Sequence, residues 1–169
     1  MTSTVAAHLE SDLGTEPRRD TAGVIAPPPL IYLGALGLGF GLDAVFGTGS
    51  LPPTVAVPVG AASIIAGAGL LGSFLGAFRR ARTPVDPYTP SQAVVTDGPY
   101  RLTRNPAYLG MALAYAGIAL VANSPWALVP LPVAIAVIDR GVIAREERYL
   151  ERKFGTPYVD YKRSVRRWL

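Results

Sequence analysis

The sequence has no cysteine and a single histidine, His8, in its 169 residues. The absence of cysteine excludes disulfides, thiolate nucleophiles and cysteine-ligated metal sites. The lone histidine lies in a polar N-terminal segment, so neither histidine general-base chemistry nor a histidine-ligated metal centre is expected. We therefore predict no metal site and look for chemistry among carboxylates, amides, aromatic side chains and arginines.

Charge is also scarce, and the apolar residues are gathered into long runs. Charged residues make up 17% of the chain and hydrophobic residues 50%, whereas a typical globular domain is about 25% charged. Asn123-Ser124-Pro125 divides the last apolar run into two helices. The sequence thus predicts an all-α, integral membrane helical bundle of about four transmembrane spans. These spans are roughly Pro29–Phe46, Thr54–Phe78, Ala107–Ala122 and Trp126–Ile143. Asp43 is expected near the end of the first span, within reach of the interface.

The basic residues lie on one side of the predicted membrane. Two precede the first span, five lie between the second and third, and nine follow from Arg140 onward, which accounts for all sixteen. The positive-inside rule then predicts that both termini and the active site are cytoplasmic. Because the bases flank apolar runs, the net charge of +4 favours membrane lipids as partners and argues against nucleic acid.

Polarity divides the chain into a tail and a membrane domain. Residues 1–26 are polar and lack apolar periodicity, so they are predicted to be a disordered cytoplasmic tail. Residues 27–169 are predicted to form one membrane domain, with a loop at 83–108 and closing helices at 144–169. Gly155 is a predicted helix stop. Beyond it, aromatic and apolar residues at helical spacing among basic ones predict a C-terminal amphipathic interfacial helix that includes Tyr158, Tyr161, Val165 and Trp168.

Two glycine patterns are similar to nucleotide-binding loops. They are Gly37-x-Gly39-x-Gly41 and Gly67-x-Gly69-x-x-Gly72. Both lie inside apolar runs with no preceding strand or following acidic residue, so the context that a dinucleotide loop needs is missing. We interpret them as helix-packing glycines, with Gly37/Gly41 and Gly72/Gly76 as the close-packing pairs. The same faces would allow a homodimer.

The stretch from Ser91 to Tyr108, SQAVVTDGPYRLTRNPAY, is crowded with turn residues, hydroxyls, aromatics and arginines. Asn105-Pro106 predicts a helix start with Asn105 as its N-cap. The third span begins at the membrane face to which the fourth returns, so Asn105 and Tyr108 should lie near Glu146 and Glu147. We expect a pocket there that suits a polar, partly cationic cofactor from the cytosol and a lipidic substrate from the bilayer. The plainer alternative is a capped helix, lipid-anchoring arginines and a solvated glutamate pair.

Two separated motifs carry a resemblance to a known family. They are Val94-Val95-Thr-Asp-Gly-Pro-Tyr100-Arg…Arg-Asn105-Pro106-Ala107-Tyr108 and Glu146-Glu147-Arg-Tyr-Leu…Phe-Gly-Thr-Pro-Tyr…Tyr-Lys…Val165. Together they resemble the isoprenylcysteine carboxyl methyltransferase and phospholipid methyltransferase family. These are integral-membrane enzymes that use S-adenosyl-L-methionine. The resemblance covers about Thr83 to the C-terminus, and it implies a methyltransferase that acts on a lipophilic small molecule or lipid.

The resemblance also implies roles for particular residues. Glu146 matches a glutamate that holds the methionine part of the cofactor, and Asn105 stands where many members have histidine. Relatives use an arginine on the last membrane helix near the substrate, for which Arg140 and Arg145 are the candidates here. The implied cofactor-binding residues are Gln92, Ala93, Val94, Val95, Tyr100, Asn105, Pro106, Ala107, Tyr108, Glu146 and Glu147.

Methyl transfer from a sulfonium chiefly requires alignment of the nucleophile and exclusion of water. A carboxylate acceptor needs no base, and arginines at the rim (Arg101, Arg104, Arg140 and Arg145) would hold it. An amine acceptor needs deprotonation, for which the sequence offers no obvious residue, so a carboxylate is favoured. Two alternatives stay open: a non-enzymatic membrane scaffold or transport partner, and a sterol-reductase-like enzyme that uses NADPH.

Overall fold

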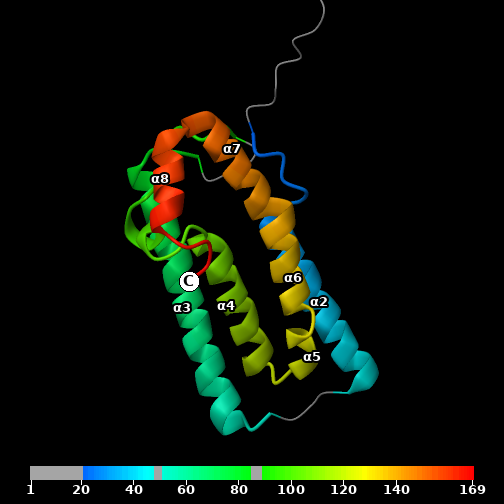
Figure 1. Cartoon of the computed structure of the whole chain (residues 1–169). Helices are drawn as coiled ribbons and strands as arrows, with labels where there is room; N and C mark the ends of the chain where they lie inside the picture. The colour runs from blue at the N-terminus through cyan, green and yellow to red at the C-terminus, as the bar shows by residue number, and fades with distance from the viewer. Residues whose placement is uncertain (1–20, 48–50, 85–88) are drawn as a thin grey trace, which may run out of the picture.

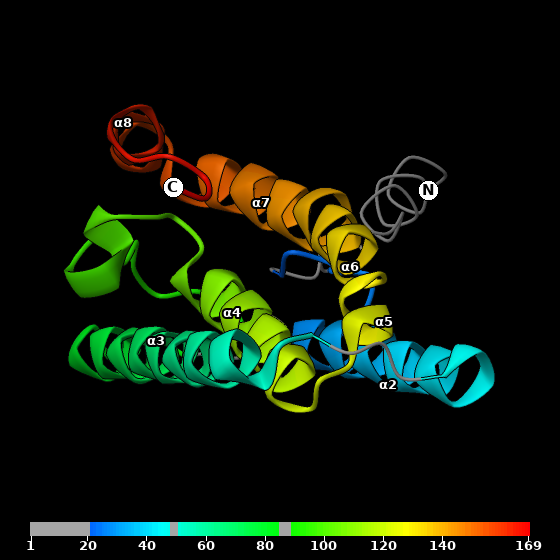
Figure 2. The ribbon, with the colours of Figure 1, turned by 90° about the horizontal axis from the view of Figure 1, so that it is seen from below.

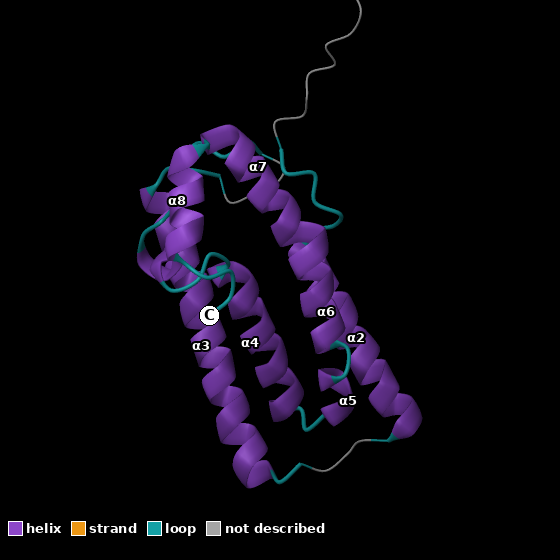
Figure 3. Ribbon diagram, viewed as in Figure 1, coloured by secondary structure: helices purple, strands orange, loops and turns teal. Residues whose placement is uncertain are grey.

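The structure is a computed structural model that describes residues 21–47, 51–84 and 89–169. Within these ranges every regular element is a helix (Figure 3). The first twenty residues of the predicted tail lie outside the described residues. Residues 21–26, predicted as part of that tail, pack on the bundle, where Val24 is buried and the Ile25 side chain lies against Gly141.

Three helical stretches are long and apolar enough to cross a membrane: α2 (Pro28–Phe46), α3 (Pro53–Arg80) and Pro125–Phe154. A shorter apolar helix, α4 (Pro106–Val121), makes the fourth. The predicted helical membrane bundle is therefore confirmed. The boundaries differ mainly at α3, which continues through Arg79 and Arg80 because a terminal arginine does not stop a helix whose carbonyls it can stabilise.

The bundle has two layers (Figures 1 and 2). One contains α2 and α3, with α4 beside α3, and the other contains α6 (Leu131–Ile138) and α7 (Ala144–Phe154), which lead to α8 (Thr156–Ser164). At one end α7 and α8 reach across to the loop between α3 and α4. At the other end short connections join the helices. We call the end with α7 and α8 the cavity end, and the end with the short connections the turn end.

The antiparallel helices α3 and α4 pack through glycines that face each other. A Cβ on Gly117 would lie 2.5 Å from the carbonyl oxygen of Gly60, and a Cβ on Gly67 would lie 2.6 Å from that of Gly110. Absence of side chains thus lets the two backbones touch, as small residues do between membrane helices.

The predicted close-packing pairs, Gly37/Gly41 and Gly72/Gly76, were wrong, although other glycines do bring helices into close contact as predicted. A Cβ on Gly37, Gly41 or Gly72 would meet nothing within 4 Å, and one on Gly76 would meet only the end of the Arg80 side chain. Spacing along one helix does not reveal which of its faces a partner helix covers. The contact glycine of α2 is instead Gly39, which lies against Ala127.

The turn end is closed by hydrogen bonds of Asn123 and Ser124. Asn123 has a positive φ of 52°, and its Oδ1 accepts from the backbone N–H of Leu51 at 2.9 Å. Ser124 caps the four-residue helix α5 (Pro125–Leu128) by accepting from the Ala127 N–H. The predicted fourth span is thus present but segmented into α5, α6 and a π-helical turn, η2 (Asp139–Ile143).

Asp43 belongs to the turn end. It is 8% exposed, and its two carboxylate oxygens have no hydrogen-bond partner among the residues that the structure describes. The expectation that it reaches the interface was therefore wrong, because α5 covers the face of α2 on which Phe46 stacks against Trp126 with ring centroids 5.1 Å apart.

The C-terminal residues take an unexpected course. Helix α7 ends at Phe154 with Gly155 at a φ of 61°, as predicted, and α8 follows. The predicted continuation of that helix through Trp168 was wrong, because α8 ends at Ser164 and Val165 is extended (φ −125°, ψ 137°). Residues 165–169, which we call the C-terminal strap, fold back against the start of α4.

Candidate functional site

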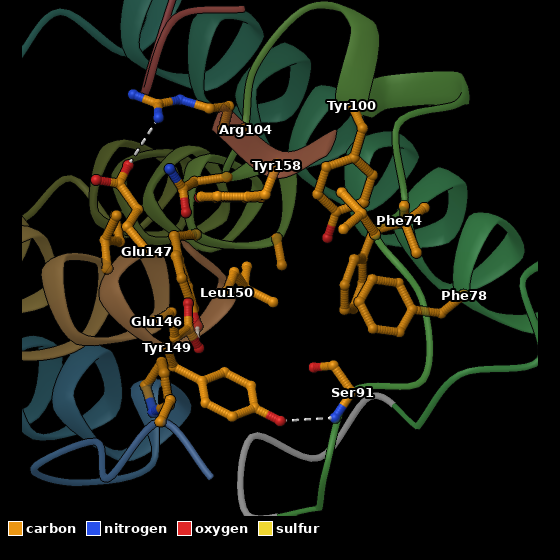
Figure 4. A pocket seen from close by; sticks show the side chains of 18 of the residues that line it. Phe74, Phe78, Ser91, Tyr100, Arg104, Glu146, Glu147, Tyr149, Leu150 and Tyr158 are labelled. Atoms are coloured by element: carbon orange, nitrogen blue, oxygen red, sulfur yellow. Dashed lines mark hydrogen bonds and ion pairs between the residues drawn. The ribbon is translucent and has the colours of Figure 1, made fainter. Parts of the chain in front are cut away.

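A cavity of about 550 Å³ opens at the cavity end (Figure 4). This volume lies within the roughly 300–1,000 Å³ typical of small-molecule sites. The walls come from the start of α2, the end of α3, the loop that follows it, the start of α4, α7 and α8. Most of the lining is apolar or aromatic, and a small set of polar side chains interrupts it: Ser91, Arg104, Asn105, Glu146 and Glu147.

Most of the predicted cofactor-binding residues meet at this cavity. Nine of the eleven line it: Ala93, Val94, Val95, Tyr100, Asn105, Ala107, Tyr108, Glu146 and Glu147. Gln92 is exposed and does not line the cavity, and its backbone N–H donates to Thr83 Oγ1 at 3.1 Å. Pro106 is fully buried at the first position of α4. The predicted proximity of the α4 start to the glutamate pair is confirmed, and the cofactor roles of these residues stay predictions.

Glu146 joins the two motifs directly. Its Oε1 accepts from the Tyr108 hydroxyl at 2.7 Å. Among the described residues this phenol is its hydrogen-bond partner, and no cation of the described chain pairs with it. A half-buried carboxylate with unused lone pairs is complementary to a positively charged group on a ligand.

The neighbouring Glu147 is already neutralised within the chain. It is 5% exposed. Arg167 donates to both of its carboxylate oxygens, at 3.1 and 2.6 Å, and its oxygens also lie 3.2 Å from Arg104 and 3.6 Å from Lys162. Successive residues on a helix point in different directions, so one glutamate faces the ligand space while the other anchors α7 to α4 and α8.

Asn105 occupies the predicted N-cap position of α4, but its side chain makes no capping hydrogen bond. Instead its Nδ2 donates to the Arg167 carbonyl oxygen at 2.8 Å. The capping prediction was wrong because it could not foresee a carbonyl from the C-terminal strap at this place. One hydrogen of Nδ2 is thus committed, and the Asn105 amide is held in a fixed orientation at the cavity wall.

Aromatic rings form one wall of the cavity (Figure 4). Tyr100 lies against Phe74 and Phe78, with ring centroids 6.4 and 6.0 Å apart. The Tyr161 hydroxyl donates to the Tyr100 carbonyl oxygen at 2.7 Å, which ties α8 to the wall. Burial raises the pKa of Tyr100 and of Tyr161 above the ordinary value of 10.0, so both phenols stay neutral.

Sequence reasoning missed three aromatic contributors. Phe74 and Phe78 stand four residues apart in the last turns of α3, next to the stop of the apolar run, and this spacing could have marked a shared face. Tyr149 on α7 holds the loop, because its hydroxyl accepts from the Ser91 backbone N–H at 3.2 Å. No local pattern distinguishes Tyr149 from other helix tyrosines.

The two arginines predicted to position the substrate lie elsewhere. Arg140 and Arg145 are exposed and do not line the cavity. The guanidinium of Arg145 donates to the Gly23 carbonyl oxygen at 2.8 Å. Arg104 supplies the guanidinium of the described lining. Its side chain is 10% exposed, its Nη1 is ion-paired with Glu147 Oε1 at 3.2 Å, and its Nε has no hydrogen-bond partner among the described residues. Substrate positioning by Arg140 and Arg145 stays a prediction.

These features define a helical integral membrane protein with a ligand-sized cavity at one end of its bundle. Residues 55–157, more than half of the chain, match the phospholipid methyltransferase family. The chain belongs to this family. The matched region holds most of the cavity wall, from Phe74 to Leu150, and ends just before the two lining tyrosines of α8.

Individual relatives agree with this assignment. The chain is 32% and 31% identical to Protein-S-isoprenylcysteine O-methyltransferases A and B of Arabidopsis thaliana, over 46% and 43% of its length. These matches span 40% and 36% of the two plant proteins, so the chain covers less than half of each. It is also 44% identical to an uncharacterized protein of Haemophilus influenzae, over 37% of this chain and 98% of that protein. No solved structure matches the chain significantly.

Proposed function

We propose that the cavity binds S-adenosyl-L-methionine and that the protein transfers its methyl group to a lipophilic membrane substrate, a carboxylate rather than an amine. The observation that carries the proposal is Glu146. Its carboxylate lies in an aromatic-walled cavity of about 550 Å³, is oriented by Tyr108, and has no cation partner among the described residues.

The residues present fit this cofactor. Its ammonium group would pair with Glu146, and the aromatic wall around Tyr100 suits an adenine ring and a neighbouring cation. The Asn105 oxygen would accept a hydrogen bond, and the loop residues Ala93, Val94 and Val95 would contact the nucleoside. When bound, the cofactor supplies a methyl group already activated on a sulfonium, so no metal or covalent intermediate is required.

The chain's own residues would then orient and shield the reactants. Tyr158 and Tyr161 of α8 line the cavity, and their rings would limit the access of water to a bound ligand. Glu147 carries no excess charge into the cavity because its cation partners balance it. Glu146 is thus the uncompensated carboxylate of the described lining.

The preference for a carboxylate acceptor is supported by the groups that are present. Arg104 supplies the guanidinium of the described lining; its Nη1 pairs with Glu147 at 3.2 Å, and its Nε has no hydrogen-bond partner among the described residues. Glu146 is committed to the cofactor in this proposal and Glu147 is paired with its cations, so neither lining carboxylate is available to take a proton from an amine. A carboxylate acceptor is already ionised, so it would pair with Arg104 and would need no group to take a proton. Transfer of labelled methyl into membrane extracts, followed by identification of the product, tests this choice, and a methylated amine would contradict it.

We further propose that the cavity end and both termini face the cytoplasm, as the basic residues indicate. The chain has no native cysteine, so single-cysteine variants can report orientation. Ser164→Cys on α8 should react with a membrane-impermeant maleimide only from the cytoplasmic side. Ala122→Cys at the turn end should react only from the other side, and the reverse pattern would overturn the orientation.

Calorimetric titration with S-adenosylhomocysteine tests the cofactor proposal. Glu146→Ala should weaken binding by about a hundredfold, since it removes a charge-assisted contact in a partly dehydrated site. The control is Asp160→Ala, which removes an exposed carboxylate of α8 that pairs with Arg163 at 3.5 Å and should leave binding unchanged. Absence of binding to the unaltered protein at millimolar ligand would end the proposal.

A further inference from the structure

The C-terminal strap, residues 165–169, holds the inner wall of the cavity without belonging to it. None of these five residues lines the cavity as described. They also lie beyond the region that matches the family, which ends at residue 157. Their contacts are therefore a property of this chain that the family match does not account for.

The backbone of the strap fixes the start of α4. The Arg166 carbonyl oxygen accepts from the Arg104 N–H at 3.0 Å. The Arg167 carbonyl oxygen accepts from Asn105 Nδ2 at 2.8 Å and from Thr103 Oγ1 at 3.0 Å. Two of the polar lining residues, Arg104 and Asn105, are thus held from behind by main-chain atoms of the strap.

The side chains of the strap fix α7 and the π-helical turn. Arg167 donates to both carboxylate oxygens of Glu147, and its Nη1 donates to Asp139 Oδ2 at 3.0 Å. Trp168 Nε1 donates to the other oxygen of Asp139, also at 3.0 Å. Arg167 therefore connects the start of α4 with α7 and η2. Glu146 lies in the first turn of α7, directly after η2.

We propose that Arg167 is a positioning residue of the cofactor site, and that the C-terminal strap sets the geometry of Arg104, Asn105 and Glu147 at the cavity wall. The inference rests on the proposed cofactor role of this cavity. The strap holds the Asn105 amide through its Nδ2. It also keeps Glu147 neutralised, so that Glu146 is the uncompensated carboxylate of the described lining.

A strap that only stabilised the fold would behave differently. Its loss would lower the melting temperature and leave the affinity of the remaining folded protein unchanged. A positioning strap instead changes ligand affinity in protein that is still folded, and the change depends on the geometry of the donor at position 167. Binding, melting temperature and the chemistry of the replacement must therefore be measured together.

The first experiment compares Arg167→Ala and Arg167→Lys with Arg163→Ala. Arg163 is the control because its side chain is 77% exposed and pairs only with Asp160 among the described residues. Arg167→Ala should raise the dissociation constant for S-adenosylhomocysteine about tenfold, since charged hydrogen bonds of this strength are lost. Lysine keeps the charge but not the fork of donors, so Arg167→Lys should raise it about threefold.

In steady-state kinetics, KM for the methyl donor and kcat should respond differently. For Arg167→Ala, KM for the methyl donor should rise about tenfold, while kcat at saturating donor changes less than about threefold. An affinity equal to that of Arg163→Ala would overturn the proposal. So would a loss of affinity that a matching loss of folded protein in the melting curve accounts for in full.

Thr103→Val keeps the test decisive if Arg167→Ala fails to fold. Thr103 does not line the cavity, and valine has nearly the same shape but cannot donate to the Arg167 carbonyl oxygen. It should weaken binding of S-adenosylhomocysteine about threefold. Unchanged binding with this variant would count against positioning by the strap.

A second experiment follows the strap itself by tryptophan fluorescence. The chain has two tryptophans, and Trp126 stacks on Phe46 at the turn end, so Trp126→Phe leaves Trp168 as the fluorescent reporter of the strap. In that background Arg167→Ala should increase quenching of Trp168 by acrylamide, and S-adenosylhomocysteine should protect it in the protein that keeps Arg167. If the ligand fails to bind at all, the proposed function fails, whereas equal quenching with and without Arg167 overturns the strap itself.

Discussion

The two ends of the bundle differ in whether a buried carboxylate is paired with cations. At the cavity end Glu147 is 5% exposed and is surrounded by Arg104, Lys162 and Arg167. At the turn end Asp43 is 8% exposed, and no described residue forms a hydrogen bond with its oxygens. Burial alone therefore does not decide whether a charge is compensated. The difference lies in which segments converge on it.

The cavity end assembles residues that are far apart in sequence. Glu147 meets Arg104 across 43 positions and Arg167 across 20, and Tyr108 meets Glu146 across 38. The turn end also joins distant segments, since the Leu51 N–H donates to Asn123 across 72 positions and Phe46 stacks on Trp126. What distinguishes the cavity end is that its converging segments carry the clustered ion pairs of the described residues, and charged groups of this kind can shape a ligand site.

The glycine contacts between α3 and α4 connect the two ends, and disturbing them should have the largest effect. Gly117→Val places a side chain against the Gly60 carbonyl oxygen and should lower the free energy of unfolding by about 3 kcal/mol. The control is Gly72→Val, because a Cβ there meets nothing within 4 Å. Thermal unfolding in detergent measures both, and equal losses would refute the close contact.

Removing the compensated charge at the cavity end should have the next largest effect. Glu147→Gln leaves Arg104 and Arg167 without their carboxylate and should cost about 2 kcal/mol of stability, discounted because Arg167 is a third exposed. Melting curves at low and high salt check the charge contribution. A variant as stable as the original protein would show that the cation cluster is solvated rather than structural.

Two tyrosines of α4 separate ligand binding from stability. The Tyr108 hydroxyl serves Glu146 at the cavity end, and the buried Tyr115 hydroxyl donates to the Ala127 carbonyl oxygen at 2.7 Å toward the turn end. Tyr108→Phe should weaken binding of S-adenosylhomocysteine about tenfold. Tyr115→Phe should cost about 1.5 kcal/mol of stability and leave binding unchanged. The opposite assignment of the two effects would break the comparison of the ends.

The smallest effect is expected at Asp43. Asp43→Asn removes a buried charge that has no partner within the described part of the chain, so it should raise the free energy of unfolding by about 1 kcal/mol rather than lower it. Binding of S-adenosylhomocysteine should not change, because Asp43 is remote from the cavity. A destabilised Asp43→Asn protein would reveal that the carboxylate has a stabilising partner in the membrane.

Much of this protein could be predicted from local patterns. Apolar runs bounded by charge predicted the membrane helices, because burial in lipid demands about twenty apolar residues whatever the neighbours. Asn123-Ser124-Pro125 predicted the turn between α4 and α5, and Gly155 predicted the end of α7, because each break follows from backbone chemistry. The short turn also predicted that Tyr108 and Glu146 would meet.

Tertiary structure decided which faces and which partners these residues use. Gly60 and Gly67 pack on α4 whereas Gly72 does not, and Glu147 rather than Glu146 takes the cations. The Asn105 amide donates to the Arg167 carbonyl oxygen instead of capping the helix. The physical reason is that periodicity specifies the element to which a residue belongs. The rotation of one helix against another, and the path of the strap, depend on contacts between segments that no local pattern encodes.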